Sequence, residues 1–219
     1  MKKKIVITGS TGMVGSLVLD LCLQNEQITE VIALVRKSTT QSHHKYKEIV
    51  VDNFLHYNNY VKSFYGVDIV FYCLGAYTGS LPIDQFRMVN YDYPLHLAKS
   101  IYEVSPTACF CLLSGQGADR TEKSKMQFAK DKGAIENALS VLYGNTFYSF
   151  RPGYIYPTTK RKEPNFFYKI SRFIYPIIKL MGNNLSITDK QLAKTIFTVG
   201  LHGYSKEILE NKDMRALHD

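Results

Sequence analysis

The sequence predicts an α/β fold in which helices cover both faces of a parallel β-sheet. Two observations support this class. Short apolar, β-branched segments alternate with segments whose apolar residues recur at helical spacing, as in βαβ units. The 219 residues are 45% hydrophobic and 21% charged, which suits one globular domain with a sizeable core. We therefore expect a single domain over residues 1–219, built around a doubly wound parallel sheet.

The expected elements follow one another closely along the first 150 residues. Strands are predicted at 4–8, 30–35, 48–51, 67–74, 108–113 and 146–150. Helices are predicted at 13–23, 58–65, 83–104 and 124–142. The pattern changes after residue 151, where amphipathic segments at 165–181 and 190–201 follow, the first interrupted by Pro176. We expect residues 153–205 to form a small helical cap over the carboxyl edge of the sheet.

A glycine-rich turn separates the first predicted strand from the first predicted helix, with the spacing G-x-x-G-x-x-G. In such a turn the first glycine permits a tight bend, the second lets phosphates approach the backbone, and the third lets the helix pack on the strand. The amino end of the helix then offers free N–H groups to the phosphates. The sequence therefore predicts a Rossmann fold that binds a dinucleotide through Gly9, Ser10, Thr11, Gly12, Met13, Val14 and Gly15.

Two basic residues, Arg36 and Lys37, follow the second predicted strand. In proteins that bind NAD, an acidic residue in this region accepts a hydrogen bond from the ribose 2′-hydroxyl. Cations there neutralise a 2′-phosphate instead, which predicts NADP with NAD as the alternative. The alternative interpretation is that Arg36 and Lys37 are solvated charges at the end of a strand and contact no cofactor. The adenosine is further expected to approach Asp52, after the third strand, and Leu74, Gly75 and Ala76, at the end of the fourth.

Ser114 and Lys132 are the candidate catalytic residues. Ser114 ends the fifth predicted strand, at the sheet edge where ligands of open α/β sheets bind. A serine combined with Tyr-x-x-x-Lys is the usual apparatus of one class of reductases, in which the tyrosine is the general acid–base and the lysine holds the nicotinamide ribose. Phe128 stands four residues before Lys132, and its side chain has no hydroxyl with which to transfer a proton.

Six segments together resemble the atypical branch of the short-chain dehydrogenase/reductase superfamily, and most of all the Tat-interacting oxidoreductase-like proteins and related bacterial NAD(P)H-binding proteins. They are 8–15, 89–93, 113–119, 132–136, 150–153 and 209–212. The resemblance implies a bound NADP(H) or NAD(H), with Ser114 and Lys132 at the serine and lysine positions. It further places the nicotinamide against Pro152, Gly153, Tyr154 and Ile155.

The same resemblance implies that Asn90 supports the active-site lysine through a water, although a surface amide is an equal interpretation. The sequence departs from the family pattern at Phe128. This departure puts ordinary carbonyl reduction in question but does not affect the expectation of nucleotide binding. Another hydroxyl would then have to supply the proton, and the candidates are Tyr77, Tyr154 and Ser124.

The remaining features bear on partners and location. The net charge of +8 is scattered and accompanies no nucleic-acid motif, so we expect no nucleic-acid partner. No apolar run reaches the roughly 20 residues that cross a bilayer. The basic amphipathic stretch at 166–181 suits a cap better than a membrane surface. The four cysteines, Cys22, Cys73, Cys109 and Cys111, form no C-x-x-C pair and predict buried thiols without disulfide or metal.

Two functions remain open from the sequence. The first is an NADP-dependent oxidoreductase or epimerase-like enzyme that acts on an unknown small molecule. The second is a nucleotide-sensing or partner-binding protein that has lost catalysis. Both follow from an intact cofactor turn beside an altered catalytic set. We expect a cytoplasmic protein that is a monomer or a homodimer.

Overall fold

The computed structural model describes residues 2–76, 81–158 and 184–218. Seven parallel strands form one sheet in the order β3-β2-β1-β4-β5-β6-β9. The chain reverses its direction of growth between β1 and β4, which creates the switch point at which doubly wound sheets bind ligands. The predicted fold class is confirmed. The strands are β1 Lys3–Thr8, β2 Ile28–Val35, β3 Tyr46–Val50, β4 Ile69–Tyr72, β5 Cys109–Leu113, β6 Phe147–Arg151 and β9 Ile208–Glu210.

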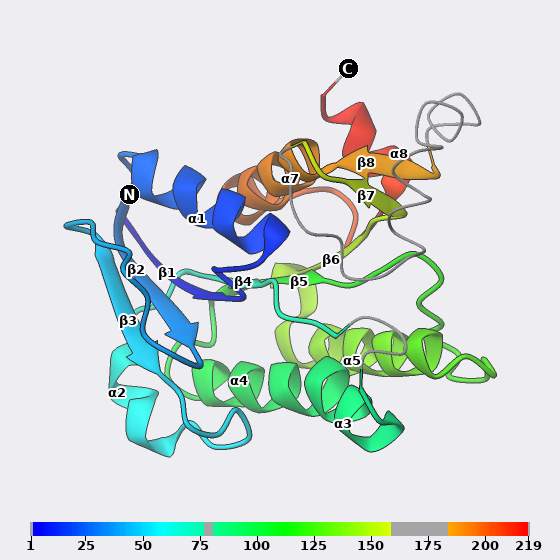
Figure 1. The fold of residues 1–219 in the computed structure, drawn as a ribbon, viewed down its shortest axis with the longest axis horizontal. Helices are drawn as coiled ribbons and strands as arrows, with labels where there is room; N and C mark the ends of the chain where they lie inside the picture. The colour runs from blue at the N-terminus through cyan, green and yellow to red at the C-terminus, as the bar shows by residue number, and fades with distance from the viewer. Residues whose placement is uncertain (1, 77–80, 159–183, 219) are drawn as a thin grey trace.

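Helices cover both faces of this sheet, with α1 and α7 on one face and α4 and α5 on the other (Figure 1). A second, two-stranded parallel sheet pairs β7 (Tyr154–Tyr156) with β8 (Ser186–Thr188). The helices are α1 Met13–Gln24, α2 Val61–Phe64, α3 Ile83–Arg87, α4 Tyr93–Tyr102, α5 Gln127–Tyr143, α7 Asp189–His202 and α8 Asn211–Ala216; single 3₁₀ turns occupy Asn58–Tyr60 and Gly144–Thr146.

Alternating side chains of the central strands supply two separate cores. Ile5 and Ile7 on β1 pack into the layer beneath α1 and α7, whereas Val6 packs into the layer beneath α4 and α5. This period of two makes β1 apolar along its length, because both of its faces are buried. The carboxyl ends of the strands, held by these two layers, carry the candidate site.

The helix predicted at 83–104 is interrupted. A π-helical turn, Met88–Asp92, separates α3 from α4. Pro94 lies in the first turn of α4 and has no N–H with which to continue the regular hydrogen-bond ladder. The π turn buries Asn90, which is 1% exposed, so this residue is not a surface amide.

One prediction about the C-terminal region is wrong. The helix expected at 190–201 is present as α7, but it packs against α1 and against β4, β5 and β6, on a face of the sheet and not over its carboxyl edge. The reason is its wide apolar side, which includes Leu192, Ile196 and Val199 and joins the core beneath α1. The segment at 165–181 and Tyr77 lie outside the described residues. The single domain over residues 1–219 and the remainder of the cap at 153–205 stay predictions.

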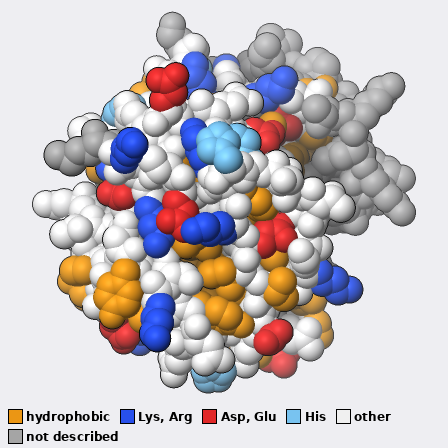
Figure 2. All heavy atoms as spheres, turned by 90° about the vertical axis from the view of Figure 1, so that its left-hand side faces the viewer, with side chains coloured by type: hydrophobic (Ala, Val, Ile, Leu, Met, Phe, Trp, Pro, Cys, Tyr) orange, Lys and Arg blue, Asp and Glu red, His pale blue; other side chains and the backbone are white. Residues whose placement is uncertain are grey.

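Basic and acidic side chains are intermingled on the side of the molecule formed by β3 and α2 (Figure 2). Ion pairs join Glu30 to Lys47 at 2.8 Å and to Lys4 at 3.8 Å, and Lys3 to Asp68 at 3.7 Å. Positive charge therefore does not form a patch of one sign on this side.

Replacement of Gly200 by alanine tests the contact between α7 and the sheet. A Cβ at this position would lie 2.5 Å from Cε1 of Phe71 on β4. Alanine favours a helix by about 1 kcal/mol over glycine, but the clash is an overpacking cost of about 1–3 kcal/mol. We expect Gly200→Ala to lower the free energy of unfolding, as measured by urea denaturation. In the double variant Phe71→Leu/Gly200→Ala the losses should be less than additive; additive losses would contradict this contact.

Candidate cofactor-binding and active site

The glycine turn is shaped by backbone-to-backbone contacts. Gly9 has a φ of +68°, and a Cβ there would lie 2.6 Å from the carbonyl oxygen of Cys73, just after β4. A Cβ on Gly15 would lie 2.1 Å from the carbonyl oxygen of Gly9. Both distances are far inside van der Waals contact, so glycine is required at the two positions. The turn can therefore lie tight against β4 at the switch point of the sheet.

The amino end of α1 is open to an anion. Gly12 is the N-cap residue, is exposed, and brings no capping side chain, while its own N–H bonds to the carbonyl oxygen of Gly9 at 2.9 Å. The first turn of α1 contains no acidic residue. The free N–H groups and the helix dipole therefore face an approachable surface, as a pyrophosphate requires. The residues present fit a dinucleotide.

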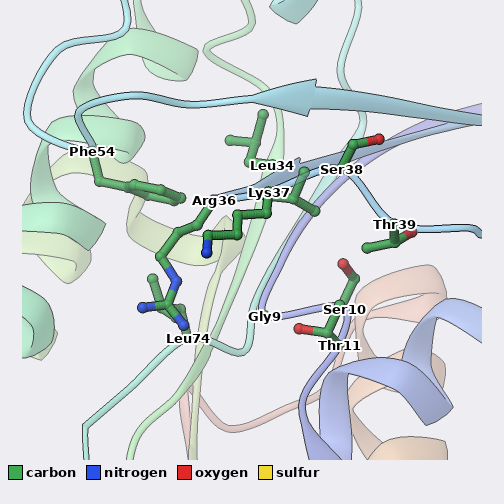
Figure 3. Close-up of a pocket in the computed structure, with 11 residues that line it drawn as sticks. Gly9, Ser10, Thr11, Leu34, Arg36, Lys37, Ser38, Thr39, Phe54 and Leu74 are labelled. Carbon is green, nitrogen blue, oxygen red and sulfur yellow. The ribbon is translucent and has the colours of Figure 1, made fainter.

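A pocket of about 500 Å³ adjoins this turn. It is lined by residues 9–11, by residues 34–39 at the end of β2 and in the following loop, and by Phe54 and Leu74. Figure 3 shows the Arg36 side chain extending past Phe54 toward Leu74, with the Lys37 amine beside it. Both basic side chains belong to exposed residues and border the same pocket as the glycine turn. The sequence thus identified two halves of one pocket.

The adenosine side differs in part from what the sequence suggested: Leu74 lines the pocket, but Gly75 and Ala76 do not. Asp52 is exposed and is not part of the pocket lining, whereas Phe54, two residues further on, is 6% exposed and contributes its ring. Sequence reasoning missed Phe54; its signal was an aromatic residue in the loop after the third strand.

Glu48 on β3 holds the loop that carries the two basic residues, and sequence reasoning missed it too. Its carboxylate accepts hydrogen bonds from the Ser38 hydroxyl at 2.9 Å, the Thr39 amide at 3.0 Å, the Thr39 hydroxyl and the Tyr46 hydroxyl at 2.8 Å. These donors, the Thr39 hydroxyl foremost, lower the pKa of Glu48 to about 2. The side chain is therefore a carboxylate at every physiological pH.

Ser114 is engaged in a buried polar network. Its hydroxyl lies 2.6 Å from Oε1 of Glu136, a residue with no exposed surface. The same carboxylate accepts hydrogen bonds from Ser149 at 2.8 Å and from Arg151 at 3.0 and 2.5 Å. A carboxylate paired with a guanidinium is only an acceptor, so Ser114 donates its proton to Glu136. In this arrangement Ser114 has no proton left to donate to a substrate carbonyl.

Phe128 packs directly on the backbone that follows Ser114. A Cβ on Gly115 would lie 2.5 Å from Cζ of Phe128, so the ring end covers this glycine. Residue 128 thus makes an apolar contact with this glycine and offers no hydroxyl.

Lys132 is buried at the same edge of the sheet, with 3% of its surface exposed. Its amine donates to the carbonyl oxygen of Leu113 at 3.3 Å. Burial lowers the pKa of Lys132 to about 8, although the negative charges of Glu136 and Asp131 act in the opposite direction. A buried lysine with a reduced pKa is typical of a functional site.

Asn90 and the end of β4 complete this part of the site. A Cβ on Gly75 would lie 3.5 Å from Oδ1 of Asn90 and 3.9 Å from the amine of Lys132. Asn90 also bonds to the Phe86 carbonyl at 3.0 Å and accepts from the Ala76 amide at 3.4 Å. The structure therefore brings three sequence-predicted positions together around Gly75.

The segment after β6 lies on the same side, held by two other elements. Gly153 donates to Oδ1 of the buried Asn211 at 3.0 Å, and the Tyr154 amide donates to the carbonyl of Leu185 at 2.9 Å. The Pro152 carbonyl accepts from Gln116 at 2.9 Å, which ties the segment to the Ser114 loop.

The alternative proton donors are placed as follows. Ser124 lies in the loop before α5, where its hydroxyl accepts a hydrogen bond from the Met126 amide at 3.1 Å. Tyr154 begins β7 and is half-buried. Both remain candidates for the proton donor, and Tyr77 lies outside the described residues.

The four cysteines are free thiols that pack in the core beneath α1 and α7. Cys109 and Cys111 share one face of β5, with their sulfur atoms 3.8 Å apart. Across residues 2–76, 81–158 and 184–218, no three acidic, histidine or cysteine side chains gather as a metal site requires. No helix within the same ranges is long and apolar enough to cross a membrane.

Replacement of Lys132 tests the burial of its charge. The folded-state pKa of about 8 lies below the ordinary 10.5, so holding the ammonium in the fold opposes stability below pH 8, by on the order of 3 kcal/mol. This penalty disappears as the pH rises from 8 to 10.5. We expect Lys132→Met to raise the thermal unfolding temperature at pH 7 by several degrees and by much less at pH 10. Lys130→Met, an exposed position on the same helix, is the control. A variant less stable than the parent at pH 7 would contradict this expectation.

Known proteins share both the sequence pattern and the fold. The model of the NAD dependent epimerase/dehydratase family matches residues 5–131, more than half of the chain. Protein HTATIP2 of Rattus norvegicus is 28% identical over 165 residues, which cover 74% of this chain and 66% of that protein.

Two solved structures show the same fold at low sequence identity. A short chain dehydrogenase from Leptospira borgpetersenii with bound NAD+ has a TM-score of 0.69 at 15% identity, covering 98% of this chain and 93% of the other. Gre2 from Candida albicans in complex with NADPH has a TM-score of 0.69 at 12% identity, covering 95% and 78%. With the glycine turn, the switch-point pocket and the family match in agreement, the chain belongs to the NAD dependent epimerase/dehydratase family.

Proposed function

We propose that this protein binds NADP(H), with the 2′-phosphate of the adenosine between Arg36 and Lys37. The observation that carries this proposal is the shared pocket: the two cations and the glycine turn line one cavity of about 500 Å³. A guanidinium and an ammonium next to each other suit a phosphate dianion, through charge-assisted hydrogen bonds. Gre2, which resembles this chain in fold, is described in complex with NADPH, whereas the Leptospira protein is described with NAD+.

The acidic residue that contacts this loop gives further support for NADP(H). Glu48 already accepts four hydrogen bonds from Ser38, Thr39 and Tyr46. Its oxygens are thus occupied and do not offer the acceptor that a ribose 2′-hydroxyl of NAD would need.

Removal of both cations tests the cofactor assignment. We expect Arg36→Ala/Lys37→Ala to weaken NADPH binding at least about tenfold, roughly 1.4 kcal/mol, and to change NADH binding less than about twofold. The measurement is a titration followed by nicotinamide fluorescence at fixed salt, because screening weakens exposed charge contacts. A matched control, Lys62→Ala/Lys99→Ala, removes two exposed positive charges from α2 and α4. Equal losses for the two cofactors would contradict a 2′-phosphate site.

For the reaction, we propose hydride transfer to or from a small molecule, as in an oxidoreductase or an epimerase-like enzyme. NADP(H) supplies that hydride chemistry when bound. Within the chain, Lys132 holds the nicotinamide ribose from its buried position beside Gly75, and Pro152 to Ile155 border the nicotinamide. Lys132 is the titratable member of the serine–tyrosine–lysine set that this chain retains, and its reduced pKa of about 8 lets it exchange a proton near neutral pH.

A second candidate is nucleotide binding without catalysis. Two observations favour it: the Ser114 proton is donated to Glu136, and the Phe128 ring covers Gly115. In that case the protein senses NADP(H) by binding it and signals to a partner protein, and it converts no small-molecule substrate. For either candidate we propose a cytoplasmic location and no nucleic-acid partner.

A hydroxyl at residue 128 distinguishes the two candidates. We expect Phe128→Tyr to raise NADPH-dependent reduction of generic aldehydes or quinones at least about a hundredfold, because it restores the Tyr-x-x-x-Lys spacing, in which the lysine lowers the pKa of the tyrosine. NADPH consumption is the measurement, and Phe128→Leu, which removes the ring without adding a hydroxyl, is the matched control. A rise of this size would mark the wild type as a disabled reductase and favour nucleotide binding without catalysis. If the tyrosine variant matches a wild type that itself turns over, the expectation is wrong, another group is the acid, and the enzyme is favoured.

A further inference from the structure

We infer that Glu48 is a positioning residue for cofactor selectivity: its carboxylate holds the loop at residues 36–39 so that Arg36 and Lys37 are presented to the pocket. This inference rests on the proposed NADP(H) function and extends it to a residue on a different strand.

The geometry ties the loop to β3 through one side chain. Glu48 accepts from the Ser38 hydroxyl at 2.9 Å and from both the amide, at 3.0 Å, and the hydroxyl of Thr39. Tyr46 lies two residues away on the same face of β3, and its hydroxyl donates to Oε1 of Glu48 at 2.8 Å. Both carboxylate oxygens are engaged, so the side chain has one defined orientation.

Apart from Glu48, the loop has a local hydrogen bond from the Gln41 amide to the Thr39 hydroxyl at 3.1 Å. Arg36, Lys37 and Ser38 are all exposed, so no burial of apolar surface fixes their backbone. Ordering exposed residues on ligand binding opposes affinity, and a loop already held in its binding conformation avoids that entropy loss. Ser38 and Thr39 directly follow the two basic residues. A restraint on the backbone at this point therefore limits the directions in which the Arg36 and Lys37 side chains can extend.

The same bonds also decide which groups recognise the phosphate. Hydroxyl groups of a loop next to a phosphate are ordinary phosphate ligands, and those of Ser38 and Thr39 border the pocket. Both donate to Glu48 instead, so recognition of the 2′-phosphate falls to Arg36 and Lys37 (Figure 3).

Two physical effects of Glu48 on NADPH binding have opposite signs, which makes the inference testable. Its negative charge repels a nearby phosphate, so neutralisation alone would tighten NADPH binding, and more so at low salt. Its hydrogen bonds order the loop, so their loss weakens NADPH binding. Four hydrogen-bond donors surround the carboxylate and offset part of its charge, and the lowered pKa of about 2 keeps it ionised as their acceptor. We therefore expect ordering to dominate.

The experiment compares full-length wild type, Glu48→Ala and Glu48→Gln by fluorescence titration with NADPH and with NADH. We expect the alanine variant to bind NADPH about tenfold more weakly and NADH within about twofold of wild type. The glutamine variant should lie between, because its amide oxygen still accepts from Thr39. Glu26→Ala, an exposed position before the start of β2, removes the same charge away from the loop and should change neither affinity.

A second measurement needs no cofactor. In hydrogen–deuterium exchange of the unliganded proteins, the amides at 36–39 should exchange faster in Glu48→Ala than in wild type, while β1 should be unchanged. Unchanged exchange in the loop overturns the inference whether or not NADPH binds.

The titration outcomes separate the two proposals. Tighter NADPH binding in both Glu48 variants would mean that charge repulsion dominates, which overturns the inference. Equal loss for NADPH and NADH would show a general structural role and would overturn it as well. If wild type shows no preference for NADPH, the proposed cofactor function itself fails, and this result is visible without any variant.

Discussion

The contact of the glycine turn with the end of β4 is the constraint on which the rest of the site depends. The turn passes so near the Cys73 carbonyl that residue 9 must be glycine, and α1 begins so near the turn that residue 15 must be glycine too. These two approaches set α1 against the switch point between β1 and β4. They thereby aim the uncapped amino end of α1 at the pocket that the loop after β2 also borders. An extra methyl group at either glycine would push apart backbone segments that have no room to move.

A second constraint operates at the other half of the sheet edge. Glu136 is fully buried on α5 and binds Arg151, Ser149 and Ser114, which come from β6 and from the end of β5. A buried carboxylate is tolerable only when its oxygens are satisfied, and here the guanidinium compensates its charge. The same bonds that satisfy Glu136 take the proton of Ser114. The Ser114 hydroxyl could either satisfy the buried carboxylate or donate to a substrate. In this structure it satisfies the carboxylate.

The two halves of the site differ in how they are held. The cofactor half is built from backbone contacts and from an exposed loop that Glu48 restrains, so its shape is set before any ligand binds. The nicotinamide half brings together Gly75, Asn90 and a buried Lys132, with Phe128 nearby on the backbone of Gly115. In the second half the Ser114 hydroxyl donates to Glu136, and residue 128 is a phenylalanine without a hydroxyl. This asymmetry explains why nucleotide binding is the better supported part of the function.

The sequence by itself determined the alternation of strands and helices, the parallel sheet and the glycine turn, because these depend on local spacing: apolar runs for two-sided burial, and glycine where a Cβ cannot fit. It also singled out Arg36, Lys37 and Ser114, since each follows a predicted strand, and Lys132, through its spacing from residue 128. Only the tertiary structure decided what these side chains contact. Nothing in the sequence near Glu48 connects it with the loop ten residues earlier; the pairing of β3 with β2 does. Likewise α7 was recognised as a helix, but its position beside α1 on one face of the sheet depends on long-range packing. Only the structure shows the π turn before Pro94 and the burial of Asn90 within it. Residue spacing along the chain determines which segments form helices and strands. Long-range packing determines which side chains are held in contacts within the fold and which can contact a ligand.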